Sequence, residues 1–277
     1  DMSDLAKSSQ VQHRGYFATL EHPQAGPTVY PTVGYKLSAT PVKLETAAPQ
    51  LASTPAIPPR SQGPAPCGAA GKGPLAGIRV LELTKVWAGP FAGKLLAFLG
   101  AEVIRVESMA SLDVTRTFGV EDMNKAPGFM AVNPQKLSVQ VDMKSKEGLA
   151  LLKQLAASCD IVIENMRPGA MERLGLGYDA LKAVRPDIIL TSMSMYGAEG
   201  PLAYQTGYAP CFGALSGMSS LVGYEGEPPT AMNIRYSDST FGSAAAFASL
   251  VALRHREQTG EGQFVDVSAV EVLTSLI

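Results

Sequence analysis

The sequence predicts an α/β fold built on a doubly wound, Rossmann-like parallel sheet with helices on both faces. From residue 77 onward, short runs rich in Val, Ile and Leu alternate with longer helical runs, which is the pattern of βαβ units. The chain has 277 residues, of which 46% are hydrophobic. It is therefore long enough and apolar enough to bury the two-sided core that such a sheet requires.

The elements follow in a regular order. A strand at 77–83 precedes a helix at 89–100, which Pro90 opens and Gly100 closes. Ser145 is a candidate cap for a later helix. Further strands are expected at 102–107, 137–143, 160–165 and 187–197, and further helices at 145–158, 169–175, 178–186, 209–219, 239–258 and 268–277. Ligands of such sheets bind beyond the carboxyl ends of the strands.

Composition divides the chain into three parts. Residues 1–48 are short extended segments and turns, with no helix long enough to form its own core. Residues 49–73 are dense in Ala, Pro, Ser and Gly, which predicts a linker. The α/β pattern occupies 74–277. Because the chain begins with Asp1 and ends within an apolar helical pattern at Ile277, we expect it to be a piece of a longer protein.

Several classes of function are disfavoured. The 23 basic and 25 acidic residues leave no positive excess for nucleic acid, and no long apolar run predicts a membrane span. Cys67, Cys159 and Cys211 lack metal-site spacing, so we expect no metal and reduced thiols in a cytoplasmic protein. No GxGxxG motif or P-loop is present, which argues against NAD and ATP.

Asp238 is the most unusual carboxylate in the chain. It stands in "NIRYSDSTFG", directly before the apolar helical run at 241–253. One interpretation is a helix cap, whose carboxylate accepts backbone N–H groups. The other is a covalent nucleophile, because Ser239, Gly242 and Ser243 are small enough to let a ligand reach the carboxylate. The pattern alone leaves both interpretations open.

Basic residues near two strand ends have a similar ambiguity. Lys144, Arg167 and Arg173 have the charge to bind phosphates, and the backbone around Gly169 allows close approach. Ordinary solvated surface charge is the alternative, and spacing alone favours it.

Four blocks of the sequence nevertheless resemble family III CoA-transferases, the formyl-CoA transferase and carnitine CoA-transferase group. They are "PLAGIRVLELTKVWAGPFAGKLLAFLGAEVIRVES" (74–108), "KLSVQVDMKSKEG" (136–148), "IVIENMRPGAMERLGLGYDAL" (161–181) and "LRHREQTGEGQFVDVS" (253–268). They occur in the family's order across 74–277. The resemblance implies the large domain of that family, with its small domain missing from this chain.

The resemblance also implies a site. Asp238 matches the catalytic aspartate, which attacks an acyl-CoA thioester, forms a mixed anhydride, and then becomes an aspartyl-CoA thioester. Ser108 stands where the family often has a basic residue, which puts that phosphate contact in doubt. Positions that contact coenzyme A in the family carry over to Trp87, Ala88, Val141, Asp142, Lys144, Asn165, Met166, Arg167 and Arg173.

Residues 1–48 resemble the closing segment of the same kind of unit, which implies a tandem fusion. One such fusion is the dimethylsulfoniopropionate CoA-transferase/lyase. Trp87 and Tyr208 would form substrate-binding walls around its sulfonium, because an indole face attracts cations. Packing of Trp87 against the adenine of CoA or the edge of the sheet is the alternative. Subsequent release of dimethyl sulfide needs a base, for which Glu107, Asp113 and Glu199 qualify by residue type only.

Other substrates fit the same pattern. Carnitine, or another carboxylic acid without a lyase step, is one alternative, and an acyl-CoA racemase or isomerase is another. Racemases of this fold carry a histidine where "TGYAP" has Tyr208, so the transferase is favoured. The implied partners are an acyl-CoA co-substrate and a small carboxylic acid. The implied assembly is an interlocked homodimer, or a pseudo-dimer within a fused chain.

Overall fold

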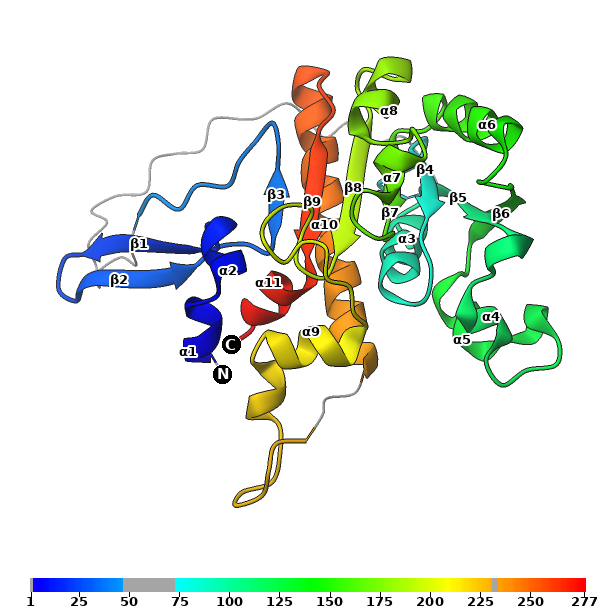
Figure 1. Cartoon of the computed structure of the whole chain (residues 1–277). Helices are drawn as coiled ribbons and strands as arrows, with labels where there is room; N and C mark the ends of the chain where they lie inside the picture. Colours follow the sequence, from blue (N-terminus) through cyan, green and yellow to red (C-terminus); the bar gives the residue numbers. More distant parts are fainter. Residues whose placement is uncertain (1, 47–72, 231–233) are drawn as a thin grey trace.

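The computed structural model describes residues 2–46, 73–230 and 234–277. Its centre is a seven-stranded sheet with the strand order β3-β9-β8-β7-β4-β5-β6 (Figure 1). All neighbouring pairs in this sheet are parallel except β3 with β9. The predicted α/β fold is confirmed. The linker predicted at 49–73 lies outside the described residues except for Gly73.

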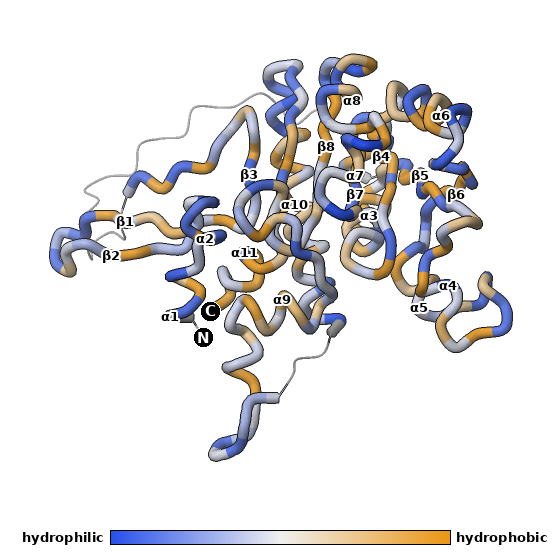
Figure 2. The backbone as a smooth tube through the Cα atoms, in the orientation of Figure 1, coloured by the Kyte–Doolittle hydropathy of each residue, from blue (hydrophilic) through white to orange (hydrophobic). Residues whose placement is uncertain are grey.

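The strands of the sheet are short. They are β3 (Tyr35–Leu37), β4 (Arg79–Leu83), β5 (Glu102–Glu107), β6 (Lys136–Gln140), β7 (Ile161–Glu164), β8 (Ile189–Ser194) and β9 (Phe264–Ser268). The sequence predicted β4 to β8 with ends shifted by a few residues. It missed β9, because "FVDVS" is too short to show a clear period. Hydrophobic residues concentrate along the central strands (Figure 2).

Helices cover both faces of the sheet. On one face α3 (Ala88–Phe98) packs against the long α10 (Ile234–Thr259). The other face carries α6 (Lys146–Ala157), α7 (Ala170–Arg173) and α8 (Tyr178–Val184). Alternate strand residues serve the two cores: Val80 belongs to the α3 and α10 side, and Leu81 to the α6 and α8 side.

Local chemistry explains several helix ends. The Ser145 hydroxyl accepts the Gly148 N–H at 2.9 Å, which confirms the predicted cap of α6. The helix predicted at 209–219 ends earlier, because Gly217 takes a left-handed conformation with φ 86°. The remaining elements beyond β5 are η1 (Met109–Ser111), α4 (Val114–Thr117), η2 (Met123–Lys125), α5 (Pro127–Val132), α9 (Ala209–Leu215), η3 (Met218–Leu221) and α11 (Ala269–Thr274).

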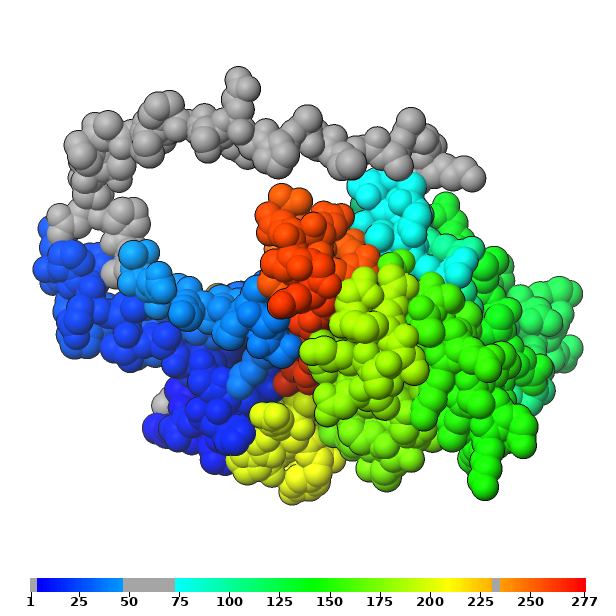
Figure 3. All heavy atoms as spheres, turned by 90° about the horizontal axis from the view of Figure 1, so that it is seen from above, coloured from blue at the N-terminus to red at the C-terminus, as the bar shows by residue number. Residues whose placement is uncertain are grey.

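Part of the segment 2–46 packs into the same core. The segment forms α1 (Met2–Ala6), α2 (Ser9–His13) and the hairpin of β1 (Phe17–His22) and β2 (Gly26–Pro31), and its last element is β3. Val11 and Tyr16 are buried in the core that contains α3 and α10. The space-filling view shows this segment in blue against the red β9 region (Figure 3). The leading segment and the α/β part therefore form one folded body.

Candidate active site

A cavity of about 490 Å³ lies beyond the carboxyl ends of β4, β7 and β8. It is lined by the β4–α3 turn, the residues after β7, the end of β8 with the loop that follows it, α9, and the first turns of α10. This is the edge of the sheet where ligands of open α/β folds bind. Its walls are formed by Lys85, Val86, Trp87, Ala88, Asn165, Met166, Arg167, Pro168, Met193, Ser194, Met195, Thr206, Gly207, Tyr208, Cys211, Phe212, Asp238 and Phe241.

Asp238 reaches the cavity from within α10. The described part of this helix begins at Ile234, so Asp238 is more than one turn inside and the cap interpretation is wrong. Within the described parts of the chain, its carboxylate forms no hydrogen bond or ion pair. Burial raises the pKa of Asp238 from 3.8 to about 6. The carboxylate is thus unpaired, partly desolvated and ionised at neutral pH.

The β4–α3 turn is held rigidly on two sides. The Asn165 side chain accepts the Lys85 N–H and donates to the Lys85 carbonyl, both at 2.9 Å. Val86 adopts a φ of 71°, which is rare for a β-branched residue, and its N–H donates to Asp113 at 3.0 Å. These bonds fix Trp87 and the start of α3 against the cavity.

Trp87 is also tied to the helix that carries Asp238. Its indole N–H donates to the Ser239 hydroxyl at 3.2 Å. The Arg235 guanidinium lies 5.2 Å from the Trp87 ring. One cation of the protein itself therefore already faces this ring.

A buried network of charges supports the turn from below. Arg105 donates to Glu82 at 2.7 Å and to Asp113 at 2.5 Å. Lys136 pairs with Glu82 at 2.7 Å, and burial lowers the pKa of Lys136 to about 8. Because each carboxylate here has a cationic partner, the network stabilises the turn rather than supplying a free base.

The three candidate bases for an elimination step do not line the cavity. Asp113 is buried and bonds Arg105, while Glu107 accepts two hydrogen bonds from Arg116. Glu199 is exposed on the β8–α9 loop. None of these side chains is placed to take a proton from a ligand beside Asp238.

The residues predicted to contact CoA divide into two groups. Trp87, Ala88, Asn165, Met166 and Arg167 line the cavity together with Asp238 and the predicted substrate contact Tyr208. The others lie outside its walls: Val141, Asp142, Lys144 and Arg173.

Two of the outer residues, Val141 and Asp142, have local roles in the fold. Asp142 accepts the Lys144 N–H at 2.9 Å in the turn before α6, and Val141 is buried. Arg173 is exposed at the end of α7. Asn165 uses its amide on Lys85, so its side chain orders the turn.

Sequence reasoning identified Tyr208 at the end of the β8–α9 loop, but it missed Met195, Thr206 and Gly207 of the same loop and Cys211 on α9. Their position after the carboxyl end of β8 was the signal that could have identified the loop residues as part of the site. The distance along the chain between Thr206 and Asp238 hid their proximity.

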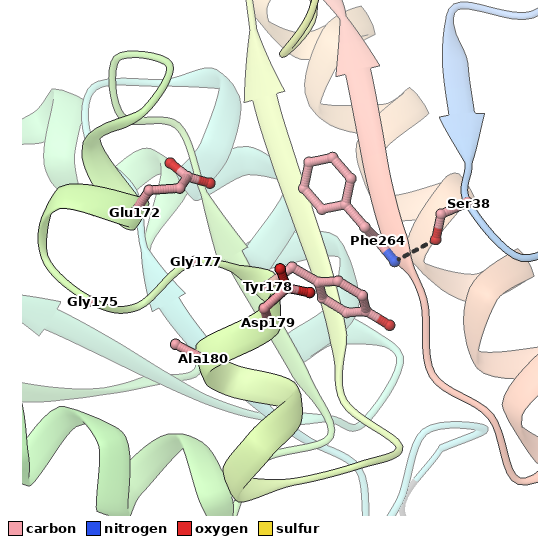
Figure 4. A pocket seen from close by; sticks show the side chains of 8 residues that line it. All are labelled: Ser38, Glu172, Gly175, Gly177, Tyr178, Asp179, Ala180 and Phe264. Atoms are coloured by element: carbon pink, nitrogen blue, oxygen red, sulfur yellow. Dashed lines mark hydrogen bonds between the residues drawn. The ribbon is translucent and has the colours of Figure 1, made fainter.

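A second cavity, of about 480 Å³, lies beside β9 and α8 (Figure 4). Its polar side chains are Ser38, whose hydroxyl accepts the Phe264 N–H, Tyr178, and the acidic Glu172 and Asp179. It contains no residue predicted to bind CoA, and its acidic character disfavours an anionic ligand. In the described ranges, no group of three or more His, Cys, Asp or Glu residues is placed to hold a metal, and no helix is long and apolar enough to cross a membrane.

The fold, with its mostly parallel seven-stranded sheet, is shared with proteins of CoA-transferase family III. The model of CoA-transferase family III matches residues 75–277, and the chain belongs to this family. A CAIB/BAIF family protein from Brucella suis has a similar structure, with a TM-score of 0.70 and 34% identity over 74% of this chain and 56% of that one.

Relatives with similar sequences are named as CoA-transferases. The chain is 39% identical to the mouse succinyl-CoA:glutarate CoA-transferase over 70% of its own length and 44% of that protein. It is 38% identical to the succinyl-CoA–D-citramalate CoA-transferase of Chloroflexus aurantiacus over 74% of its length and 51% of that protein. The chain thus spans about half the length of these relatives.

Proposed function

We propose that the protein containing this chain transfers CoA from an acyl-CoA to a dicarboxylic acid, with Asp238 as the covalent nucleophile. The observation that carries this proposal is the unpaired Asp238 carboxylate, which shares one cavity with five of the predicted CoA contacts. The relatives support the substrate class, because they are named for glutarate, citramalate and malate.

The proposed reaction begins when an Asp238 oxygen attacks the thioester carbonyl of the donor. The C–S bond breaks, CoA leaves as the thiolate, and a mixed anhydride forms. The thiolate then attacks the aspartyl carbonyl, which releases the donor acid and leaves an aspartyl-CoA thioester. The incoming carboxylate attacks this thioester to give a second anhydride, and the thiolate attacks its substrate carbonyl. Product acyl-CoA leaves and Asp238 regains its carboxylate.

The cavity supplies two positive charges for anionic substrates. Arg167 is exposed at the rim, where a guanidinium suits the phosphates of CoA. Lys85 is half-buried, and its ammonium donates to the Ser111 carbonyl and hydroxyl. We assign Lys85 as the cation that binds the second carboxylate of a dicarboxylic acid, because a carboxylate needs a cationic partner once it is transferred from water into the cavity.

The sulfonium substrate has less support. Trp87 was its predicted binding wall, but this ring already lies against Arg235, and none of the candidate bases reaches the cavity. The relatives reported above are CoA-transferases, and none is named for a lyase or racemase step. Tyr208 lines the cavity where a racemase would need its histidine.

We propose further that residues 1–48 are the closing segment of a CoA-transferase unit and that 74–277 are the opening part of one. The support is that β3 extends the sheet beside β9 and that Arg14 is buried against Asp266 and Glu271. A segment from an unrelated domain would not be expected to supply the edge strand of this sheet. An interlocked dimer or a fused pseudo-dimer remains a prediction for the intact protein.

The test is a substrate panel on the intact protein. Succinyl-CoA is offered with glutarate, malate, citramalate, carnitine or dimethylsulfoniopropionate, and both acyl-CoA products and dimethyl sulfide are measured. We expect turnover with the dicarboxylic acids, which Asp238→Asn abolishes and Asp179→Asn, in the second cavity, leaves intact. Turnover of the sulfonium acid with release of dimethyl sulfide, and none of the dicarboxylic acids, would overturn the proposed substrate class.

A further inference from the structure

The loop between β8 and α9, residues 195–208, forms part of the Asp238 cavity with both of its ends. Met195 lines the cavity as the loop leaves β8. Thr206, Gly207 and Tyr208 line it again where the loop returns to α9. A shift in the middle of this loop would therefore move two walls of the cavity.

The middle of the loop wraps around one side chain from the leading segment. Gln10, on α2, is 1% exposed. Its amide donates to the carbonyls of Tyr196 and Glu199 at 3.0 and 2.8 Å and accepts the Leu202 N–H at 2.7 Å. One side chain thus satisfies three backbone groups of a segment that has no strand or helix to satisfy them.

The loop is shaped to receive this side chain. Gly200 has a φ of 113°, and a Cβ at this position would lie 2.5 Å from the Gln10 oxygen. Gly197 has a φ of 86°, and a Cβ there would collide with the Arg14 guanidinium. Both glycines therefore permit the backbone to close around α2 at conformations that other residues rarely adopt.

Arg14 fixes α2 to the sheet beneath the loop. Its guanidinium donates to Asp266 at 2.5 Å and to Glu271, and all three side chains are buried. The second oxygen of Asp266 accepts the Ala198 N–H of the loop at 2.9 Å. The helix, the sheet and the loop are thus connected by one continuous set of bonds.

We propose that Gln10 is a positioning residue for the Asp238 cavity: it sets the path of the 195–208 loop and thereby the walls that receive the acyl-CoA. This inference rests on the proposed function, and it means that the leading segment helps to shape the site. Gln10 acts through the loop and does not touch the substrate itself.

The experiment compares Gln10→Met with Gln12→Met in the intact protein. Methionine keeps the size of glutamine but removes its hydrogen bonds, and Gln12 is exposed on the same short helix. Two readouts are taken on folded protein: the KM and kcat of CoA transfer, and the rate at which N-ethylmaleimide modifies Cys211. Cys211 lines the cavity beside Gly207, so its reactivity reports on the loop without requiring activity.

For Gln10→Met we expect the KM for acyl-CoA to rise about tenfold, with a smaller change in kcat, because the lost bonds loosen a binding wall. The Cys211 modification rate should change as well, while Gln12→Met matches the wild type in both readouts. Equal behaviour of the two variants would overturn the inference. If wild type has no transferase activity but Cys211 reactivity still depends on Gln10, the proposed function fails and the positioning of the loop stands. Should Gln10→Met not fold, Gln10→Asn, whose amide is one methylene too short, takes the same test with the same criteria.

Discussion

Asp238 lies in the cavity at a cost to stability, and replacing it by asparagine should make this cost measurable. Asparagine has nearly the shape of aspartate but carries no charge that burial can penalise. Burial raises the pKa of Asp238 from 3.8 to about 6, a shift of about two units, each of which corresponds to about 1.4 kcal/mol. The upper limit of the gain is therefore about 3 kcal/mol, and solvent entering the cavity reduces the expected gain to roughly 1–2 kcal/mol.

The sign of the effect depends on pH. The folded-state pKa of Asp238 is above the unfolded value, so protonated Asp238 favours the folded state. This contribution to stability is fully present below pH 3.8 and is lost as pH rises through 6, where the ionised carboxylate is penalised by burial. Asp238→Asn should thus be more stable than wild type at pH 8, and the difference should shrink toward zero as pH falls to 4.

Urea unfolding of both proteins at pH 8 and at the lowest pH where both remain folded measures this difference. Asp179→Asn is the matched control, because it removes an exposed aspartate from the second cavity. A variant that is no more stable at pH 8, or whose gain is independent of pH, would refute the reasoning that Asp238 is a desolvated, unpaired carboxylate.

Three further predictions follow from the site. CoA should slow alkylation of Cys211, which lines the cavity, whereas Cys159 should stay unmodified because burial raises its pKa to about 11. Mass spectrometry of the labelled peptides measures the modification of both cysteines. Equal labelling of Cys211 with and without CoA would contradict the placement of the ligand. Asn165→Ala should lower the free energy of unfolding by about 1–3 kcal/mol and raise the KM for acyl-CoA, since two backbone groups of Lys85 lose their partner. An unchanged KM would limit Asn165 to a role in folding. Arg14→Met should cost about 3–5 kcal/mol in urea unfolding, because it leaves two buried carboxylates unpaired, and a loss below about 1 kcal/mol would mean that the leading segment is only loosely attached.

The order of strands and helices was predictable because local signals agree with the fold. The Ser145 cap, the β-branched strands and the Gly100 helix end each act within a few residues. The strand β9 was not predictable in this way, since five residues carry little periodicity and its strand pairing depends on distant partners.

The site residues also divide into those that the sequence identified and those whose position depends on distant contacts. Asp238, Trp87 and Arg167 were identified through sequence blocks that resemble a family, and the structure brings them to one cavity. Only Tyr208 of the β8–α9 loop was identified, because the path of the loop depends on Gln10, which lies 186 residues before Tyr196. No local pattern records a contact of that separation.

The central claim is that Asp238 itself carries the acyl group, and oxygen transfer tests it most directly. A dicarboxylic acid with both carboxylates labelled with heavy oxygen is turned over with unlabelled succinyl-CoA, and the peptide that contains Asp238 is weighed. In the proposed sequence the second anhydride breaks at the substrate carbonyl, so one labelled oxygen must remain on Asp238. A heavier Asp238 peptide is the predicted result. Label found in the released succinate and absent from Asp238 would show that the acids react with each other directly, and would contradict the account.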